Sequence, residues 1–383
     1  MDPALVFTAT VAGAAFAYSL LWVVILCVPF LLTVFLVSDR LGLETRKGLV
    51  DLIRENYGRL AALGCAALVI AINFAMIVAD LMAVSDAMSL LLGQQRMYFV
   101  ALTAFSVWYI LILHDYRPFI RIFLWLALPL FTYVAAALMA APSAGWVLLS
   151  TAIPTIPRTP AYAAATVALF GSLLTPYALV WKTSSRREMA EKRALLPGSH
   201  SWTGRIVTCV LAYSIIVATG SVLHLPFASN MNTLRATDSL QRVVGSVGPY
   251  MFALGIIGAG MVALPMLVAS ISYSLAEAMG WRTGLSEHPW DARRFYVLIS
   301  VSMLAAGFLN FLPVNPVRAA YLSQVLAGIL AIPILLFILI LSNDRRVMRT
   351  TNSRWQNFWF GAAIGGLAGA ALLLAWWKMT GGR

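Results

Sequence analysis

Ten long apolar blocks divide this 383-residue chain. Each is close to spanning length, because a hydrocarbon core of about 30 Å requires about 20 apolar residues in a helix. Apolar and polar residues do not alternate within the blocks, as they do in the strands of a membrane β-barrel. We therefore predict an all-α polytopic membrane protein with about ten full transmembrane helices. The blocks cover residues 15–37, 60–82, 97–113, 119–141, 161–181, 205–224, 248–273, 295–313, 320–342 and 356–377.

A partial helix is expected before the first full span. Residues 4–14 are also apolar, and a single helix over residues 4–37 would be about 51 Å long at 1.5 Å per residue. This length is too great for one crossing. The stretch is therefore predicted to hold one full span preceded by a shorter piece.

The composition excludes a soluble globular protein. Hydrophobic residues make up 61% of the chain and charged residues only 11%, whereas ordinary domains have about 45–50% and about 25%. Twenty of the 27 Lys and Arg residues fall in connections that alternating spans place on one side of the membrane, at residues 40–59, 117–121, 182–205, 282–294 and 345–354. This bias is typical of cytoplasmic loops. It predicts a multi-pass protein of the cytoplasmic (inner) membrane, surrounded by lipid bilayer, and explains the net charge of +12 without a nucleic-acid partner.

Proline interrupts the apolar sequence at two places where a helix break is predicted. Asp2-Pro3 precedes the first span, and Thr175-Pro176-Tyr177 lies inside the block at 161–181. Proline in a helix interior removes a backbone donor and kinks or breaks the helix. Broken helices at corresponding places of two halves indicate a binding site near the bilayer midplane in transporters. An ordinary proline kink is the alternative at each place.

Asp80 lies within an apolar span, in the sequence Ala-Met-Ile-Val-Ala-Asp-Leu-Met. An ionisable group at membrane depth is costly and usually lines a polar path, although a position at headgroup level would explain it equally simply. Asp86 and Glu277 lie closer to span ends, which favours that simpler explanation for both. Asn73, Asn310 and Gln324 are expected to make hydrogen bonds between helices.

Motifs of soluble or metal-dependent enzymes are missing from the sequence. The four histidines have no HxxxH or HExxH spacing, and neither GxSxG nor a P-loop occurs. Cys27, Cys65 and Cys209 lie in apolar blocks without metal-binding spacing and are read as packing residues. We therefore expect neither an enzyme nor a bound cofactor.

Several ordered motifs resemble those of the Nramp family of divalent metal-ion transporters over nearly the whole chain. Asp2-Pro3 and the following AGAAFAYSLLW resemble the family's first-helix motif Asp-Pro-Gly-Asn and the "AGAxFGYxLLW" after it. Further similar segments are Arg40-Leu41-Gly42 with Lys47-Gly48-Leu49, residues 252–260, residues 310–316, residues 322–326 and residues 342–348. Each motif is weak alone, but their order and spacing are specific.

The resemblance implies a LeuT-like bundle forming a single transporter domain over residues 1–383. Two inverted five-helix repeats would meet at broken helices one and six. Residues 1–141 would be what the chain holds of the first repeat, residues 161–342 the second, and residues 356–377 an additional helix. On this reading the chain starts inside helix one, at its unwound turn, without the first half-helix.

The resemblance also implies a metal site that is only partly kept. Asp2 matches the metal-binding aspartate, Thr175 stands where the family has methionine, the carbonyl of Ser172 would be a ligand, and Gln324 matches the glutamine of helix ten. Leu5 replaces the motif's asparagine. Pro3, Pro176 and Tyr177 mark the helix breaks, with Tyr177 in place of a histidine. Asp80 matches the aspartate of the family's Asp-x-x-Glu proton path, whose glutamate is Ala83 here.

These implied changes lead to a functional hypothesis. Thioether ligands favour softer transition metals, whereas oxygen donors suit hard ions. We therefore expect a secondary transporter that moves divalent cations by alternating access, as a symporter if protons are coupled, with Mn²⁺ or Fe²⁺ or, given the lost ligands, Mg²⁺ as substrate. A non-transporting scaffold or sensor, favoured by Leu5 and Ala83, and a transporter of an organic substrate are the alternatives.

Overall fold

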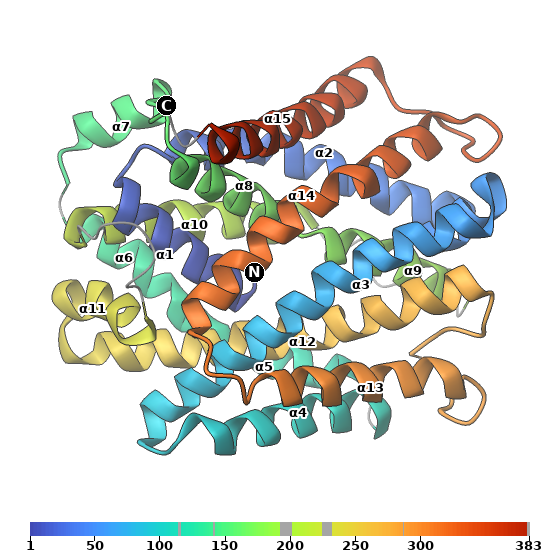
Figure 1. The fold of residues 1–383 in the computed structure, drawn as a ribbon, viewed down its shortest axis with the longest axis horizontal. Helices are drawn as coiled ribbons and strands as arrows, with labels where there is room; N and C mark the ends of the chain where they lie inside the picture. The colour runs from blue at the N-terminus through green and yellow to red at the C-terminus, as the bar shows by residue number, and fades with distance from the viewer. Residues whose placement is uncertain (114–115, 141, 192–200, 224–231, 286, 381–383) are drawn as a thin grey trace.

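In a computed structural model the chain forms a bundle of helices of widely differing length (Figure 1). The structure describes residues 1–113, 116–140, 142–191, 201–223, 232–285 and 287–380, and no β-strand occurs among them. The long helices are α2 (Leu21–Thr45), α3 (Leu49–Leu92), α4 (Arg96–Leu113), α10 (Ser201–Val222), α12 (Gly248–Met279), α13 (Arg293–Leu309), α14 (Pro316–Asn343) and α15 (Arg354–Met379). The shorter ones are α1 (Pro3–Phe16), α5 (Tyr116–Ala127), α6 (Thr132–Met139), α7 (Ala144–Ala152), α8 (Pro160–Leu174), α9 (Pro176–Glu191) and α11 (Thr233–Val244).

Within the described residues, nine helical segments have the length and hydropathy to cross a membrane. The predicted tenth span, at 295–313, is α13, which has 17 residues and ends at Leu309. Asn310 ends this helix early because its side-chain amide turns back to the carbonyl of Ala306 (2.8 Å), and Pro313 follows. The predicted partial span is α1, which has 14 residues.

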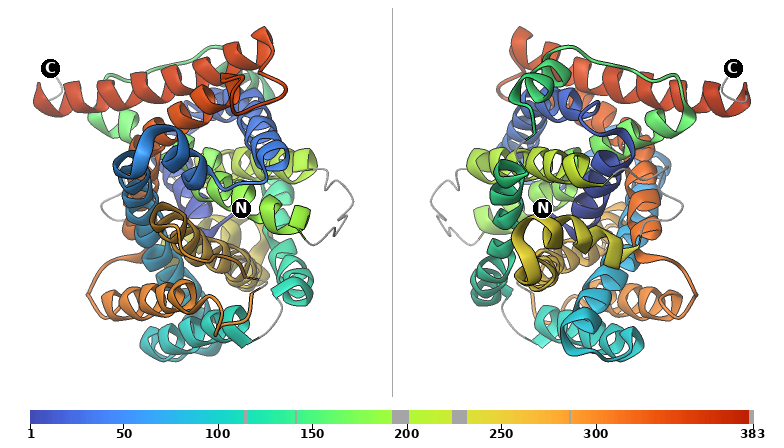
Figure 2. Two further views of the ribbon diagram at one scale, coloured as in Figure 1. Left: turned by 90° about the vertical axis from the view of Figure 1, so that its right-hand side faces the viewer. Right: turned by 90° about the vertical axis from the view of Figure 1, so that its left-hand side faces the viewer.

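Helix α1 lies at the centre of the molecule. The N-terminus marks the middle of the bundle in all three views (Figures 1 and 2), and α1 packs against α3, α8, α10, α12 and α14. Residues 3–14 are all buried. Such an all-apolar helix has no polar face, so it is stable only when it is surrounded on every side. The structure therefore places the start of the chain in the protein interior.

The predicted span at 161–181 is broken at its proline, as the sequence indicated, into two helices. Helix α8 ends at Leu174, and α9 begins at Pro176. Between them Thr175 adopts φ 40°, in the left-handed region that a β-branched residue rarely occupies. Pro176 lacks the amide hydrogen that would otherwise bond to the carbonyl of Ser172, so the break frees that carbonyl.

Next to this break, small residues allow α8 to approach α14 closely. A Cβ added at Gly171 would lie 2.6 Å from the Gly328 nitrogen, and the Gln324 carbonyl would be nearer still. The backbones of the two helices are therefore almost in contact. This contact fixes the height of Gln324 relative to the break at Thr175.

The remaining spans differ in detail from the predicted blocks. Helix α3 is 44 residues long and contains a non-helical Gly58 (φ 85°). The block at 119–141 is interrupted by a 3-10 turn at Leu128–Phe131 that contains Pro129. The short helices α7 and α11 were not predicted. Helices α4 and α13 lie at one edge of the bundle and α15 at the opposite edge (Figure 1).

Candidate functional site

Asp2 is fully buried at the start of α1. It is the N-cap residue, and its Oδ1 accepts a hydrogen bond from the backbone nitrogen of Leu5 (2.8 Å). Pro3 occupies the first helical position, where its missing N–H costs nothing. A buried carboxylate at a helix N-terminus is stabilised by the helix dipole and by this cap. The sequence around Asp2 therefore fixes its carboxylate at the N-terminus of α1.

Tyr177 connects the start of α1 with the break between α8 and α9. Its hydroxyl donates a hydrogen bond to Oδ2 of Asp2 (3.2 Å) from the first turn of α9. The two proline-marked positions, 175 residues apart in sequence, are therefore in direct contact. The sequence pointed to Tyr177 as a marker of the break, but nothing in it showed that its hydroxyl would reach Asp2.

Asp80 lies on α3, fully buried and on the same side as Asp2. Neither of its oxygens has a hydrogen-bond partner among the described residues, although the carboxylate lies within electrostatic reach of Asp2 and of the Ala4 amide. Buried polar groups without partners are rare and call for an explanation such as an ion or water. Asp80 is therefore enclosed by the protein, with a carboxylate that an ion, a proton or a water molecule could satisfy.

Gln324 is another buried side chain without a hydrogen-bond partner among the described residues. It is fully buried on α14, and neither Oε1 nor Nε2 has a hydrogen-bond partner among the described residues. Its backbone carbonyl abuts Gly171, one residue before Ser172. Gln324 therefore does not make the hydrogen bond between helices that its sequence context alone suggested. Asn73 and Asn310 do, to the carbonyls of Leu267 and Val78 (3.3 Å each).

Ser172 and Thr175 lie at the break itself. The Ser172 hydroxyl is buried and donates to the carbonyl of Leu169 (3.0 Å), within its own helix. Only its backbone carbonyl, which Pro176 leaves without the usual helical donor, is therefore suited to bind a ligand. Thr175 is half-buried, and its backbone nitrogen closes α8 by bonding to the Gly171 carbonyl (3.1 Å).

Another buried carboxylate lies beside the middle of α9. Glu277 of α12 is 1% exposed and accepts hydrogen bonds from the Ser184 hydroxyl (2.6 Å) and the Val50 nitrogen (3.2 Å). Next to it, the Leu49 nitrogen donates to the Thr183 hydroxyl (3.2 Å). Glu277 therefore caps α3 and ties α3, α9 and α12 together. Its place near a span end does not make it an exposed headgroup residue.

This arrangement is not a preformed metal cluster. Within the described residues, no three His, Cys, Asp or Glu side chains come together as metal ligands do. Asp2 and Asp80 instead lie near each other at the start of α1, and the Gln324 backbone lies against Gly171, one residue before the carbonyl freed at the break between α8 and α9.

Comparison with known proteins identifies the family. The family model for natural resistance-associated macrophage protein-like sequences matches residues 1–377. This chain belongs to the Nramp family. Among similar Nramp proteins, the divalent metal cation transporter MntH of Verminephrobacter eiseniae is 27% identical over 387 residues, covering 97% of this chain and 84% of that protein.

Two further relatives agree with this assignment. MntH of Pectobacterium carotovorum is 24% identical, with 93% of this chain and 86% of that protein covered. The metal transporter NRAT1 of rice (Oryza sativa subsp. japonica) is 26% identical over 298 residues, but the match spans only 51% of the rice protein. The chain therefore corresponds to about half the length of the rice relative.

Solved structures show the same fold. Crystal structures of the Eremococcus coleocola manganese transporter superpose with a TM-score of 0.73 over 98% of this chain and 82% of theirs, at 15% identity. This likeness confirms the predicted LeuT-like helical membrane fold. At this identity it shows the fold alone, so the roles of individual Nramp site residues remain predictions for this chain.

Proposed function

We propose that this Nramp protein is a secondary transporter that moves a divalent cation across the cytoplasmic membrane by alternating access. Asp2, Gln324 and the Ser172 carbonyl would contact the ion, with Thr175 beside them, and Asp80 would carry the coupled proton. The observation that supports this most directly is the buried Asp80 carboxylate, which lies within electrostatic reach of Asp2 and has, among the described residues, only the Ala4 backbone amide near enough to interact with it as a donor.

The physical reason is charge balance. Two buried carboxylates repel each other when both are ionised, and a cation or a proton between them relieves that repulsion. The Asp2 oxygens each accept one hydrogen bond here, and a carboxylate oxygen can accept two. Asp2 thus keeps acceptor capacity for an ion while Tyr177 remains in contact.

The donor set favours a hard ion. All candidate ligands are oxygens, since Thr175 replaces the thioether that softer transition metals prefer. Mg²⁺ keeps several water molecules and uses one or two carboxylates. We therefore propose that the protein transports Mn²⁺-like ions with weakened discrimination against Mg²⁺.

Uptake into proteoliposomes tests both parts. We expect ⁵⁴Mn²⁺ uptake that excess Mg²⁺ inhibits, and loss of uptake in Asp2→Asn. Asp80→Asn should retain ion binding but lose coupled acidification of the lumen, reported by a pH-sensitive dye. Asp86→Asn, on the same helix but half-exposed, is the matched control and should behave as wild type.

Two results would contradict the proposal. Wild-type protein that binds Mn²⁺ by calorimetry without transporting it would favour the scaffold or sensor, a reading that Leu5 at the missing asparagine position supports. Wild-type uptake that is unchanged in Asp2→Asn would place the ion elsewhere.

A further inference from the structure

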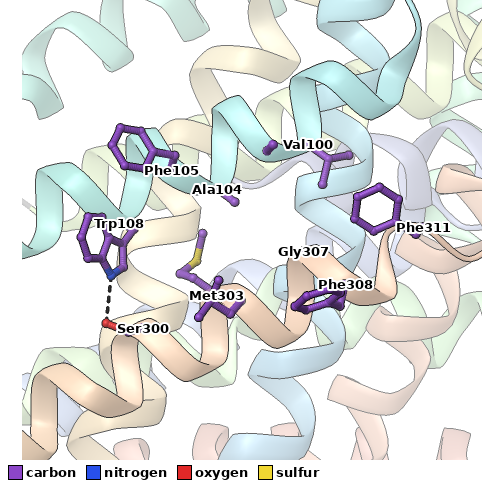
Figure 3. Close-up of a pocket in the computed structure, with 11 residues that line it drawn as sticks. Val100, Ala104, Phe105, Trp108, Ser300, Met303, Gly307, Phe308 and Phe311 are labelled. Carbon is purple, nitrogen blue, oxygen red and sulfur yellow. Dashed lines mark hydrogen bonds between the residues drawn. The ribbon is translucent and has the colours of Figure 1, made fainter.

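An apolar groove lies between α4 and α13, at the edge of the bundle (Figures 1 and 3). Its volume is about 450 Å³. Val100 and Met303 are buried in its floor, whereas Phe105, Phe308 and Phe311 are more than half exposed along its sides. The Trp108 indole donates a hydrogen bond to the Ser300 hydroxyl (2.8 Å) and closes one end.

Small side chains create this groove. Ala104 on α4 and Gly307 on α13 both line the groove, at positions where larger residues would occupy the space between the two helices (Figure 3). A Cβ added at Gly307 would meet no atom within 4 Å. The space is therefore a consequence of residue choice, and a longer side chain could fill it without moving the backbone.

The length of the groove matches one leaflet of a bilayer. Along α4 it runs from Val100 to Trp108, which is about 12 Å at 1.5 Å per residue. Half of a hydrocarbon core is about 15 Å thick. Two occupants of the groove can be compared by width. A helix with its side chains is about 10–12 Å wide, too wide for a gap between two neighbouring helices. An acyl chain is only one methylene group wide and fits such a gap.

A positive charge stands at the open end. Arg96 begins α4 one turn before Val100, so both lie on one helix face. Its guanidinium donates long hydrogen bonds, 3.5 Å each, to the carbonyls of Asn310 and Val314, just beyond Phe311. A guanidinium has five N–H donors in a planar fork that matches a phosphate. Charge at the headgroup level and an apolar groove below it fit an anionic amphiphile.

We propose that this groove binds one anionic phospholipid of the bilayer, with its phosphate on Arg96 and one acyl chain along Val100, Ala104 and Gly307 down to Trp108. The lipid belongs to the leaflet on the side of residues 93–95. It fills the space between α4 and α13 and joins them as a part of the folded transporter. This binding site is independent of the proposed ion site.

Native mass spectrometry of the full chain tests the proposal, with phosphatidylglycerol or phosphatidylcholine added to detergent-purified protein. We expect wild type to retain one phosphatidylglycerol, and Gly307→Leu to lose it. Arg96→Gln should bind phosphatidylglycerol about tenfold more weakly, as expected for one lost charge-assisted hydrogen bond. Binding of phosphatidylcholine, whose choline group balances the phosphate charge, should weaken less in Arg96→Gln.

Matched controls separate this site from general effects. Gly361→Leu adds the same side chain to an exposed glycine of α15 with open space around it, and Arg242→Gln removes an exposed charge from α11. Both should retain the lipid. As a second readout, phosphatidylglycerol with brominated acyl chains should quench wild-type tryptophan fluorescence more than that of Trp108→Phe, and Gly307→Leu should abolish the difference.

Three outcomes would overturn the proposal. Equal retention of phosphatidylglycerol by wild type and Gly307→Leu would show that the groove is not the site. Equal retention of both lipids by wild type would remove the role of Arg96. A dimer that dissociates in Gly307→Leu would assign the groove to a second copy of the chain.

Discussion

At the residue scale, Tyr177 competes with a bound ion for the Asp2 carboxylate. The Tyr177 hydroxyl donates a hydrogen bond to one carboxylate oxygen at 3.2 Å, and the Leu5 backbone nitrogen donates to the other. A hydrogen bond to a charged group contributes about 1.5–3 kcal/mol. An ion that binds Asp2 must share the carboxylate with this donor or displace it, so Tyr177 sets part of the cost of ion binding.

Replacing Tyr177 by phenylalanine should therefore tighten ion binding. Without the competing donor, we expect the Kd of Asp2-dependent Mn²⁺ binding to fall by up to about tenfold, equivalent to about 1.4 kcal/mol. Isothermal titration calorimetry measures this directly. Tyr250→Phe, at an exposed position, is the control. Weaker binding in Tyr177→Phe would instead make the hydroxyl an ion ligand.

At the scale of elements, the break between α8 and α9 depends on an unfavourable backbone conformation. Thr175 has φ 40° and ψ 70°, and a left-handed conformation costs an L-residue other than glycine roughly 1–2 kcal/mol. The surrounding helices hold it there, through the close contact of Gly171 with α14 and the bond from Tyr177 to Asp2. Strain of this kind is commonly found at functional sites.

Thr175→Gly should consequently stabilise the fold. We expect an increase of about 1 kcal/mol, reduced by the greater flexibility of glycine in the unfolded chain. A thermal unfolding assay in detergent would show a higher Tm. Thr166→Gly, in the regular part of α8, should lower the Tm, because glycine costs about 1 kcal/mol in a helix interior. A lower Tm in Thr175→Gly would mean that the threonine side chain outweighs the strain.

At the scale of the whole molecule, contacts with two neighbouring helices hold α9, the helix that follows the break at Thr175. Lys182 forms an ion pair with Asp39 of α2 (3.3 Å), and Ser184 donates to Glu277 of α12. Together with the bond from the Val50 nitrogen to Glu277, these contacts join α2, α3, α9 and α12. From the count of basic residues we predict that this part of α9 faces the cytoplasm.

Glu277→Ala should loosen these contacts of α9 with its neighbouring helices. It removes the acceptor shared by Ser184 and the Val50 amide, leaving both donors without it. We expect a cysteine at position 183, which is buried, to react severalfold faster with a maleimide than it does when Glu277 is present. Glu287→Ala, in the connection that follows α12, is the control. An unchanged labelling rate would show that Glu277 only caps α3.

The orientation of the whole molecule can be tested in the same way. The charge bias places residue 94 outside and residue 346 in the cytoplasm, and both positions are exposed. In intact cells an impermeant maleimide should label Gln94→Cys but reach Arg346→Cys only after permeabilisation. The native Cys27, Cys65 and Cys209 are buried and give little background. The reverse labelling pattern would invert the topology.

The amino-acid sequence was enough to predict that the chain crosses a membrane many times and that a helix breaks at Pro176, but not the irregular backbone at Gly58 or at Leu128–Phe131. Hydropathy and proline act locally, because each span must satisfy its own backbone hydrogen bonds. It also singled out Asp2 and Asp80, because a buried charge stands out in apolar sequence. It could not determine that α13 stops at Asn310 or that short helices α7 and α11 form.

Which of these groups come into contact depends on the packing of the helices. The Tyr177 hydroxyl reaches Asp2, Gln324 remains without a partner while Asn73 and Asn310 find theirs, and Glu277 is buried by α3 and α9 rather than exposed at a span end. These outcomes depend on how closely helices far apart in sequence approach each other. That distance is set by small residues such as Gly171 and Gly328 on facing helices, and no local pattern encodes it.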